Sequence, residues 1–282
     1  MKNAGQAASH RTSANRLRPV AGRHNARLKE LRMAFRRAEL TSDGECAIEG
    51  VKLVEEALRH APQIATIFFS ESARPLAEKL LPQIGERIET VVLPDALFKS
   101  VVPSEAPQGV AALVKLPAFT AQQLLERAND GPLLVVSGLQ DPGNLGTIMR
   151  SAEAFGAAGL FLTEGTVSSY NSKALRGSAG SIFRLPLAKI ASAELISLLR
   201  AKGVRLLATS SHKGTPLAEG NWNPPIAIFI GNEGAGLPRE IMHQMDETLV
   251  IPQSEPVESL NAGVAASIVL YEAARNRKSG CD

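Results

Sequence analysis

The stretch LLVVSGLQDPGNLGTIMRSAEAFG, residues 133–156, predicts a buried strand, a turn and a helix in succession. Residues 133–136 are all apolar, which is typical of a parallel strand whose two faces are both covered by helices. The turn 141–143 contains Asp, Pro and Gly, and the apolar spacing after it indicates a helix that starts near Asn144 and carries Arg150 on its second turn. The stretch therefore predicts an α/β fold with a functional turn after this strand.

The same alternation continues to the C-terminus. We expect further strands over 159–163, 204–209, 226–230 and 248–251, and further helices near 171–177 and over 191–201 and 259–275. Ligands of a parallel sheet bind where its strands end and lead into helices. The loops 138–144, 231–238 and 252–259 are therefore the ones expected to carry chemistry.

The N-terminal half predicts a smaller α/β domain. NARLKELRMAFRRAEL, from Asn25, is an amphipathic basic helix, and short strands and helices alternate after it. We expect a disordered basic arm over 1–24, this smaller domain over 25–115, a linker over 116–131 and a second α/β domain over 132–282.

Composition excludes several classes of protein. The chain has 282 residues, of which 44% are hydrophobic, enough for one large or two modest domains. No apolar run approaches the roughly 18 residues of a membrane helix. Cys46 and Cys281 are too few for a disulfide framework, which favours a reducing, cytoplasmic compartment, and the histidines lack a metal-binding spacing. We expect no metal site.

Positive charge is concentrated at the N-terminus. Residues 1–40 contain ten Lys and Arg against two acidic residues, whereas the rest of the chain is mildly acidic. A basic segment on an acidic body favours contact with a polyanion, most plausibly nucleic acid. Two alternatives stay open, a solvated tail and an Arg-rich transit peptide.

The first loop poses a question about Asn144 and Arg150. Their six-residue separation places them roughly 240° apart around a helix, so we expect Asn144 to act in the turn and Arg150 to project from the helix. Asn144 could instead cap the helix. The neighbours of Arg150 are nearly all small or apolar, so we expect a buried guanidinium that requires an anion, with an exposed arginine as the alternative.

The second loop, IFIGNEGAGLP, follows a core strand with three glycines. Glycines allow tight turns and the close approach of a ligand. Their order, G-x-x-G-x-G, differs from the dinucleotide fingerprint, and the G-K-[ST] of a phosphate-binding loop is absent. Asn232 and Glu233 directly after the strand make this loop a candidate site.

The third loop, IPQSEPVESLNAGVAAS, ends at a long apolar helix. Ser259 is predicted to be its N-cap, and Asn261 is then a polar residue in the first turn. Between the second and third predicted strands of this half, Lys173 and Arg176 form either a surface that contacts phosphate or an ordinary solvated surface.

Three motifs, N-x-G-x-x-x-R, G-N-E-G-x-G-L-P and I-P-x(6)-S-L-N, occur in this order and closely resemble the SpoU (TrmH-type) family. This family comprises S-adenosylmethionine-dependent RNA ribose 2′-O-methyltransferases of the SPOUT superfamily. The resemblance covers about 133–275, and 25–115 resembles the family's accessory RNA-binding domain. It implies a trefoil-knotted α/β domain and a homodimer formed through this C-terminal domain.

The resemblance also implies roles for individual residues. The implied active-site positions are Asn144, Arg150, Glu233, Ser259 and Asn261. The implied positions around the methyl donor are Gly231, Asn232, Leu237, Ile251 and Leu260. The RNA-binding positions that we expect from the basic segments are Arg27, Lys29, Arg32, Arg36, Lys173 and Arg176. One departure is Ala262-Gly263, where the family often has Val-Ser.

The chemistry of the motifs suggests how these residues act. No histidine, cysteine or metal cluster is placed to take the proton of the ribose hydroxyl. We therefore expect Arg150 to stabilise a developing alkoxide electrostatically, since a guanidinium hardly deprotonates in proteins. An unpaired carboxylate would repel RNA, so Glu233 is expected to have a cation or backbone N–H groups as its partner.

The predicted function is 2′-O-methylation of RNA, with large-subunit ribosomal RNA favoured by analogy. Transfer RNA is an alternative substrate. A non-catalytic RNA-binding or ribosome-assembly factor is an alternative class, and a nucleotide-dependent oxidoreductase is a weaker one because its fingerprint is absent.

Overall fold

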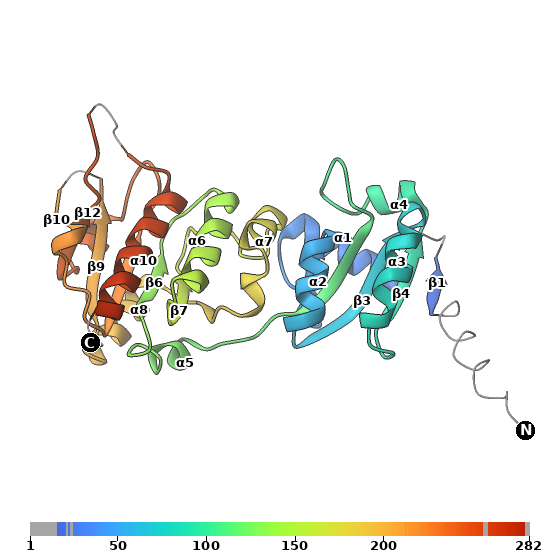
Figure 1. Ribbon diagram of the computed structural model, residues 1–282, viewed down its shortest axis with the longest axis horizontal. Helices are drawn as coiled ribbons and strands as arrows, with labels where there is room; N and C mark the ends of the chain where they lie inside the picture. The colour runs from blue at the N-terminus through green and yellow to red at the C-terminus, as the bar shows by residue number, and fades with distance from the viewer. Residues whose placement is uncertain (1–15, 21, 23–24, 212, 256–258, 280–282) are drawn as a thin grey trace, which may run out of the picture. The chain divides into compact units, whose positions relative to one another are not determined.

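The computed structural model describes residues 16–279 except 21, 23–24, 212 and 256–258. These residues form two units that divide at Leu116/Pro117, with Tyr170–Ser172 assigned to the first unit. Figure 1 shows the elements of both units. Each unit is described separately below.

The N-terminal unit contains one mixed five-stranded sheet, in the order β1-β4-β3-β5-β2. Its strands are β1 (Leu17–Pro19), β2 (Glu45–Glu49), β3 (Gln63–Ser70), β4 (Glu89–Leu93) and β5 (Val110–Lys115). Its α-helices are α1 (Ala26–Arg37), α2 (Val51–His60), α3 (Arg74–Leu80) and α4 (Asp95–Lys99). Leu28, Leu31 and Ala34 of α1 pack into a core with Phe68 and Phe98.

The expected disordered arm is wrong for Leu17–Pro19, because these residues form β1 and pair in parallel with β4. The guanidinium of Arg16 donates hydrogen bonds of 2.7 and 2.9 Å to the carbonyls of Ile84 and Gly85. These backbone and side-chain bonds hold the start of the described chain against the sheet. Most of the remaining residues of the expected arm, 1–15, 21 and 23–24, lie outside the described residues.

The C-terminal unit contains a seven-stranded sheet in the order β10-β12-β9-β11-β6-β7-β8, and every pairing is parallel. Its strands are β6 (Leu133–Val136), β7 (Gly159–Leu162), β8 (Leu187–Lys189), β9 (Arg205–Ser210), β10 (Thr215–Pro216), β11 (Ile226–Ile230) and β12 (Glu247–Val250). Its α-helices are α5 (Ala121–Leu125), α6 (Pro142–Ala154), α7 (Ser172–Ser178), α8 (Ser192–Ala201), α9 (Arg239–Met242) and α10 (Ala262–Ser279).

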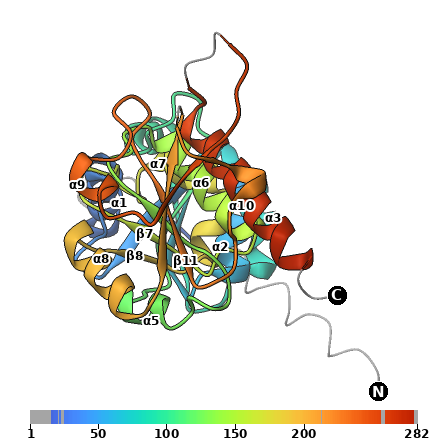
Figure 2. The same cartoon turned by 90° about the vertical axis from the view of Figure 1, so that its left-hand side faces the viewer.

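Helices cover both faces of this parallel sheet, as the apolar strands predicted. Figure 2 shows α5 and α8 on one side of the strands and α6 and α10 on the other. Alternate residues of a strand point to opposite faces, and Leu133 and Val135 of β6 pack with α5 and α8. Leu124 and Leu125 of α5 are buried in this core, so the expected linker contributes a helix to the C-terminal unit.

The last helix is fixed to the unit by Arg277. Its guanidinium donates hydrogen bonds to the carbonyls of Phe155, Gly156 and Asp130, at 2.6, 3.0 and 3.3 Å. Burial lowers the pKa of this guanidinium. Ser151 of α6 and Ser267 of α10 share a further hydrogen bond of 2.7 Å. The two helices that follow the first and third loops are therefore held side by side.

Candidate functional site

The turn after β6 is organised by Asp141, which caps α6. Its Oδ1 accepts a 2.9 Å hydrogen bond from the backbone N–H of Asn144, and its Oδ2 accepts one of 2.8 Å from Nζ of Lys173. The hydrogen bond from Lys173, followed by that from Asn144, holds the pKa of Asp141 below its usual range. The alternative that Asn144 caps the helix is therefore wrong, and its side chain is available for other contacts.

The side chain of Asn144 connects the three motif loops. Its Nδ2 donates a 2.7 Å hydrogen bond to Oε1 of Glu233, and its Oδ1 accepts a 2.8 Å bond from Nδ2 of Asn261. A carboxylate only accepts hydrogen bonds, so this network fixes which end of the Asn144 amide faces Glu233. Glu233 thus has a partner, but the expected cation or backbone N–H is wrong, since the partner is a side-chain amide.

Asn261 begins the last helix. Its Oδ1 accepts hydrogen bonds of 3.0 and 3.2 Å from the backbone N–H groups of Gly263 and Val264, which is how an N-cap residue satisfies the first turn of a helix. The helix α10 accordingly starts at Ala262. The prediction that Ser259 is the N-cap, with Asn261 inside the helix, is wrong by two residues.

The departure at Gly263 has a local steric reason. A Cβ atom at position 263 would lie 3.1 Å from Cβ and 3.2 Å from Cγ2 of Thr147 on α6. Such contacts are tighter than ordinary van der Waals packing, so a serine at this position would require Thr147 to shift. Gly263 therefore allows the first turn of α10 to approach the second turn of α6 closely.

The second loop folds back on itself directly after β11. A Cβ atom on Gly231 would lie 2.3 Å from the carbonyl carbon of Gly236 and 2.5 Å from the nitrogen of Leu237, so only glycine fits there. Oδ1 of Asn232 accepts from the backbone N–H groups of Gly234 and Ala235, at 2.9 and 3.0 Å. Both contacts hold the loop in a compact turn.

The side chain of Asn232 also connects the second loop to the first. Its Nδ2 donates a 3.0 Å hydrogen bond to the carbonyl of Gly138. Every hydrogen bond of this side-chain amide among the described residues is therefore made to a backbone group. Asn232 therefore shapes the loop that other groups line.

A pocket opens where these loops meet at the carboxyl ends of β9, β11 and β12. The five expected donor-binding residues line it, as do Glu233 and Ser259. Asn144, Arg150 and Asn261 are not among the described residues of its lining. The remaining lining is contributed by Thr209, Ser210, Ser211, Ile230, Gly234, Ala235, Gly236, Met242, Gln253, Ala262 and Ala265.

Arg150 is exposed, so the expectation of a buried guanidinium is wrong. Its neighbours in the sequence, among them Ile148, Met149 and Ala152, are buried on the inner face of α6, whereas Arg150 lies on the outer face. In the described part of the chain, it makes no hydrogen bond or ion pair. It is therefore a cation available to an external anion.

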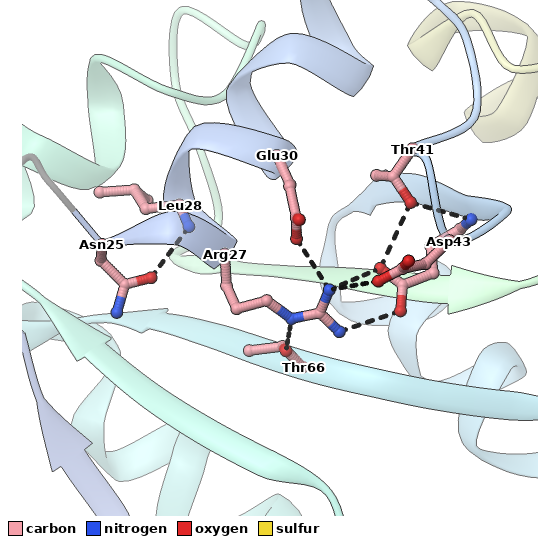
Figure 3. Close-up of polar contacts among 8 residues, drawn as sticks. Asn25, Arg27, Leu28, Glu30, Thr41, Asp43 and Thr66 are labelled. Carbon is pink, nitrogen blue, oxygen red and sulfur yellow. Dashed lines mark hydrogen bonds and ion pairs between the residues drawn. The ribbon is translucent and has the colours of Figure 1, made fainter.

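Arg27, expected to bind RNA, is instead bound within the N-terminal unit (Figure 3). Its guanidinium donates to both carboxylate oxygens of buried Glu45, at 2.9 and 3.0 Å, and to Glu30 at 2.7 Å. Nε donates to Thr66 at 3.2 Å. Burial disfavours its charge, but the hydrogen bonds to Glu45 and Glu30 outweigh burial and raise its pKa. Arg27 thus attaches α1 to the sheet.

Lys29, Arg32 and Arg36 differ from Arg27. They lie within about 60° of one another around α1, using 100° per residue. Lys29 and Arg36 are exposed and Arg32 is half-buried, and among the described residues none of the three has a hydrogen-bond or ion-pair partner. We call these three residues the α1 basic stripe.

Lys173 and Arg176 on α7 are both exposed, but neither is an unpartnered cation. Lys173 is paired with Asp141, which positions the turn before Asn144. A phosphate at this surface would therefore compete with a carboxylate for Lys173. The α1 basic stripe has no such competitor among the described residues.

Three further features of the described residues concern metal ions, the thiol of Cys46 and membranes. No three His, Cys, Asp or Glu side chains there are grouped so as to hold a metal ion. The Cys46 thiol is buried, and burial raises its pKa to about 12, which keeps it protonated at neutral pH. No described helix has the length and apolar character needed to cross a bilayer.

We predict that Asn144→Asp destabilises the protein by about 1–3 kcal/mol at neutral pH. The substitution keeps the acceptor for Asn261 but places a second carboxylate against Glu233. The two carboxylates repel each other only while both are ionised, so the destabilisation is expected to be larger at neutral pH than at acidic pH.

Urea denaturation of wild type and variant at neutral and at acidic pH measures the effect. Asn223→Asp is the control, because Asn223 is exposed and its side chain has no partner among the described residues. A destabilisation that is independent of pH would show that the Asn144–Glu233 contact does not form.

Comparisons with known proteins find relatives that match both units of the chain. Residues 131–271 match the model of the SpoU rRNA Methylase family, and residues 25–112 match the MRM3-like substrate binding domain. The chain is 31% identical over 255 residues to the 23S rRNA (guanosine(2553)-2′-O)-methyltransferase RlmP of Bacillus subtilis, covering 90% of this chain and 98% of the relative. It is 33% identical over 267 residues to the 23S rRNA (uridine(2479)-2′-O)-methyltransferase of Streptomyces viridochromogenes, covering 91% and 92%.

A solved structure gives the same result for the fold. The SpoU methyltransferase AviRb from Streptomyces viridochromogenes, in complex with AdoMet, matches with a TM-score of 0.77 and 30% identity over 90% of this chain and 99% of that one. The motif loops, the two-unit architecture and these matches lead to one conclusion: the chain belongs to the SpoU rRNA methylase family.

Proposed function

We propose that this protein transfers the methyl group of S-adenosylmethionine to the 2′-hydroxyl of a ribose in large-subunit ribosomal RNA. The observation that carries the proposal is the junction at Asn144, which connects the three family loops beside a pocket lined by the expected donor-binding residues. The two relatives named above are 23S rRNA methyltransferases with different target nucleotides. Ribosomal RNA is therefore favoured over transfer RNA as the substrate. Because the two relatives modify different nucleotides, sequence identity to them does not indicate the target nucleotide.

The pocket fits the methyl donor. Gly231 has no space for a side chain on its loop side, and this lets the loop stay compact at the end of β11. The expected positions Gly231, Leu237, Ile251 and Leu260 would hold the donor, with apolar side chains against its flat base and backbone groups toward its polar atoms. When bound, the donor supplies an activated methyl group on sulfur.

Arg150 is proposed to stabilise the reacting oxygen. In the transfer, an O–C bond forms at the ribose, the C–S bond breaks with its electron pair left on sulfur, and the hydroxyl proton passes to water. Negative charge therefore develops on the 2′-oxygen, and a cation near it lowers the barrier. The exposed guanidinium of Arg150 has no competing partner among the described residues, and its fork can also bind the adjacent phosphate.

Asn144, Glu233, Ser259 and Asn261 are proposed to position the loops and the ribose. All five active-site positions of the family motifs are intact, which argues against a non-catalytic RNA-binding factor. An oxidoreductase is less favoured because the second loop folds without the dinucleotide fingerprint.

We predict that Arg150→Ala lowers the rate of methyl transfer by about 100-fold or more, because one transition-state contact of this kind contributes that much. Arg150→Lys keeps the charge but loses the planar fork and is expected to retain only part of the rate. The assay uses methyl-labelled S-adenosylmethionine and unmodified 23S rRNA. Lys202→Ala, at an exposed cation after α8, is the control. Near-wild-type turnover of Arg150→Ala would contradict this role.

The α1 basic stripe is proposed to bind the RNA backbone. Three unpartnered cations on one helix face can bind phosphates, whereas Arg27 is bound to Glu45. For Lys173 and Arg176, the expected contact with RNA stays a prediction. So does a role in RNA binding for the first residues of the chain.

We predict that replacing Lys29, Arg32 and Arg36 together by alanine weakens binding of 23S rRNA and lowers its salt slope by about 2, since each phosphate contact contributes about 0.7 on single strands. Filter binding over a range of KCl concentrations measures both quantities. Arg74→Ala/Lys79→Ala, at two exposed cations of α3, is the control. An unchanged slope in the triple variant would mean that the stripe does not contact phosphates.

A homodimer through the C-terminal unit is also proposed. Val264, Ile268 and Tyr271 are large apolar side chains on one face of α10 and are 46%, 36% and 54% exposed. Their spacing of four and three residues makes a continuous apolar row, which monomers rarely leave in water. The ring of Tyr271 also packs edge-on against Phe155, with centroids 5.8 Å apart.

We predict that light scattering gives twice the chain mass of 29.9 kDa for the wild type, and that Ile268→Asp shifts the mass to that of one chain. The control is Leu40→Asp, at an exposed leucine of the other unit. A monomeric wild type at micromolar concentration would contradict the proposal. The trefoil knot and the cytoplasmic location stay predictions.

A further inference from the structure

Gln253 is a polar residue of the pocket whose buried side-chain oxygen has no hydrogen-bond partner in the described part of the chain. It lies two residues after Ile251 in the loop that follows β12, and it lines the pocket beside Leu237 and Leu260. Its Oε1 is buried and has no hydrogen-bond partner. No other hydrogen bond of this side chain is present among the described residues. A buried carbonyl oxygen without a partner is unfavourable, so its partner is expected to be a ligand.

Three other polar side chains of the pocket have partners. Asn232 is bonded to three backbone groups, and Glu233 accepts from Asn144. Thr209 donates its hydroxyl to the carbonyl of Phe229, at 3.2 Å. Among the described residues that line the pocket, Gln253 is therefore the one whose buried side-chain oxygen has no hydrogen-bond partner.

We propose that Gln253 recognises the adenine base of the methyl donor by accepting a hydrogen bond from its exocyclic amino group. A glutamine carboxamide matches adenine in two places, because its oxygen accepts from the amino group while its nitrogen donates to a ring nitrogen. The neighbouring Leu237, Ile251 and Leu260 supply the apolar surface that a flat base requires. The inference rests on the proposed donor pocket and adds to it the specificity for adenine.

The test measures binding rather than turnover, by titration calorimetry. The two ligands are S-adenosylhomocysteine and S-inosylhomocysteine, in which an oxygen replaces the amino group. Wild type is expected to bind the adenosyl compound about tenfold more tightly, the contribution of one hydrogen bond. In Gln253→Met, affinity for the adenosyl compound falls and the ratio approaches one. Gln253→Glu keeps an acceptor and is expected to retain the preference.

Gln244→Met is the matched control, since Gln244 is exposed and does not line the pocket. It is expected to leave both affinities unchanged. A melting curve of each variant establishes that it is folded. If Gln253→Met retains the wild-type ratio, or weakens both ligands equally, the inference is wrong.

Gly231→Ala distinguishes this failure from failure of the proposed pocket. The added methyl group collides with the Gly236–Leu237 peptide and is expected to abolish binding of both ligands. If Gly231→Ala binds both like wild type, the donor pocket is misplaced and the inference fails with it. If Gly231→Ala loses binding while Gln253→Met keeps the ratio, only the role of Gln253 is contradicted.

Discussion

The site depends on one carboxamide that uses both of its ends. Asn144 donates to Glu233 and accepts from Asn261, so a single side chain connects loops that follow three different strands. Asp141 makes this possible by capping α6 in its place. Without the cap, the Asn144 side chain would compete for the first turn of its own helix. The order of these two residues in the turn is therefore a structural requirement of the site.

The parallel sheet explains why these loops can meet. β6 and β11 are neighbours, and β12 is separated from β11 only by β9, so the carboxyl ends of all three lie at one edge. Arg277 and the Ser151–Ser267 bond fix α10 against α6, and this sets the separation between Asn144 and Asn261. Arg150 lies on the outer face of α6, so its guanidinium is an exposed cation on a helix that is packed against α10.

Much of this fold could be predicted from local pattern, because buried parallel strands are apolar runs and their loops follow directly. The short strands β1, β8 and β10 were not predicted, since strands of two or three residues are defined by their neighbours rather than by their own sequence. The cap of the last helix was assigned to Ser259 rather than Asn261, because several polar residues compete for that position. The apolar residues next to Arg150 in the sequence favoured a buried side chain. In the helix, however, those apolar residues lie on the inner face and Arg150 lies on the outer face. The Asn144 contacts span 89 and 117 residues, which no local pattern indicates.

The most direct test of the central claim is a crystal structure of the protein with S-adenosylhomocysteine bound. We expect the ligand between loop 231–237 and residues 251–253 and 259–260, with the hydrogen bonds of Asn144 to Glu233 and Asn261 retained. A ligand bound elsewhere, or one that enters only when Asn144 releases Glu233, would contradict the claim that this junction builds the donor site.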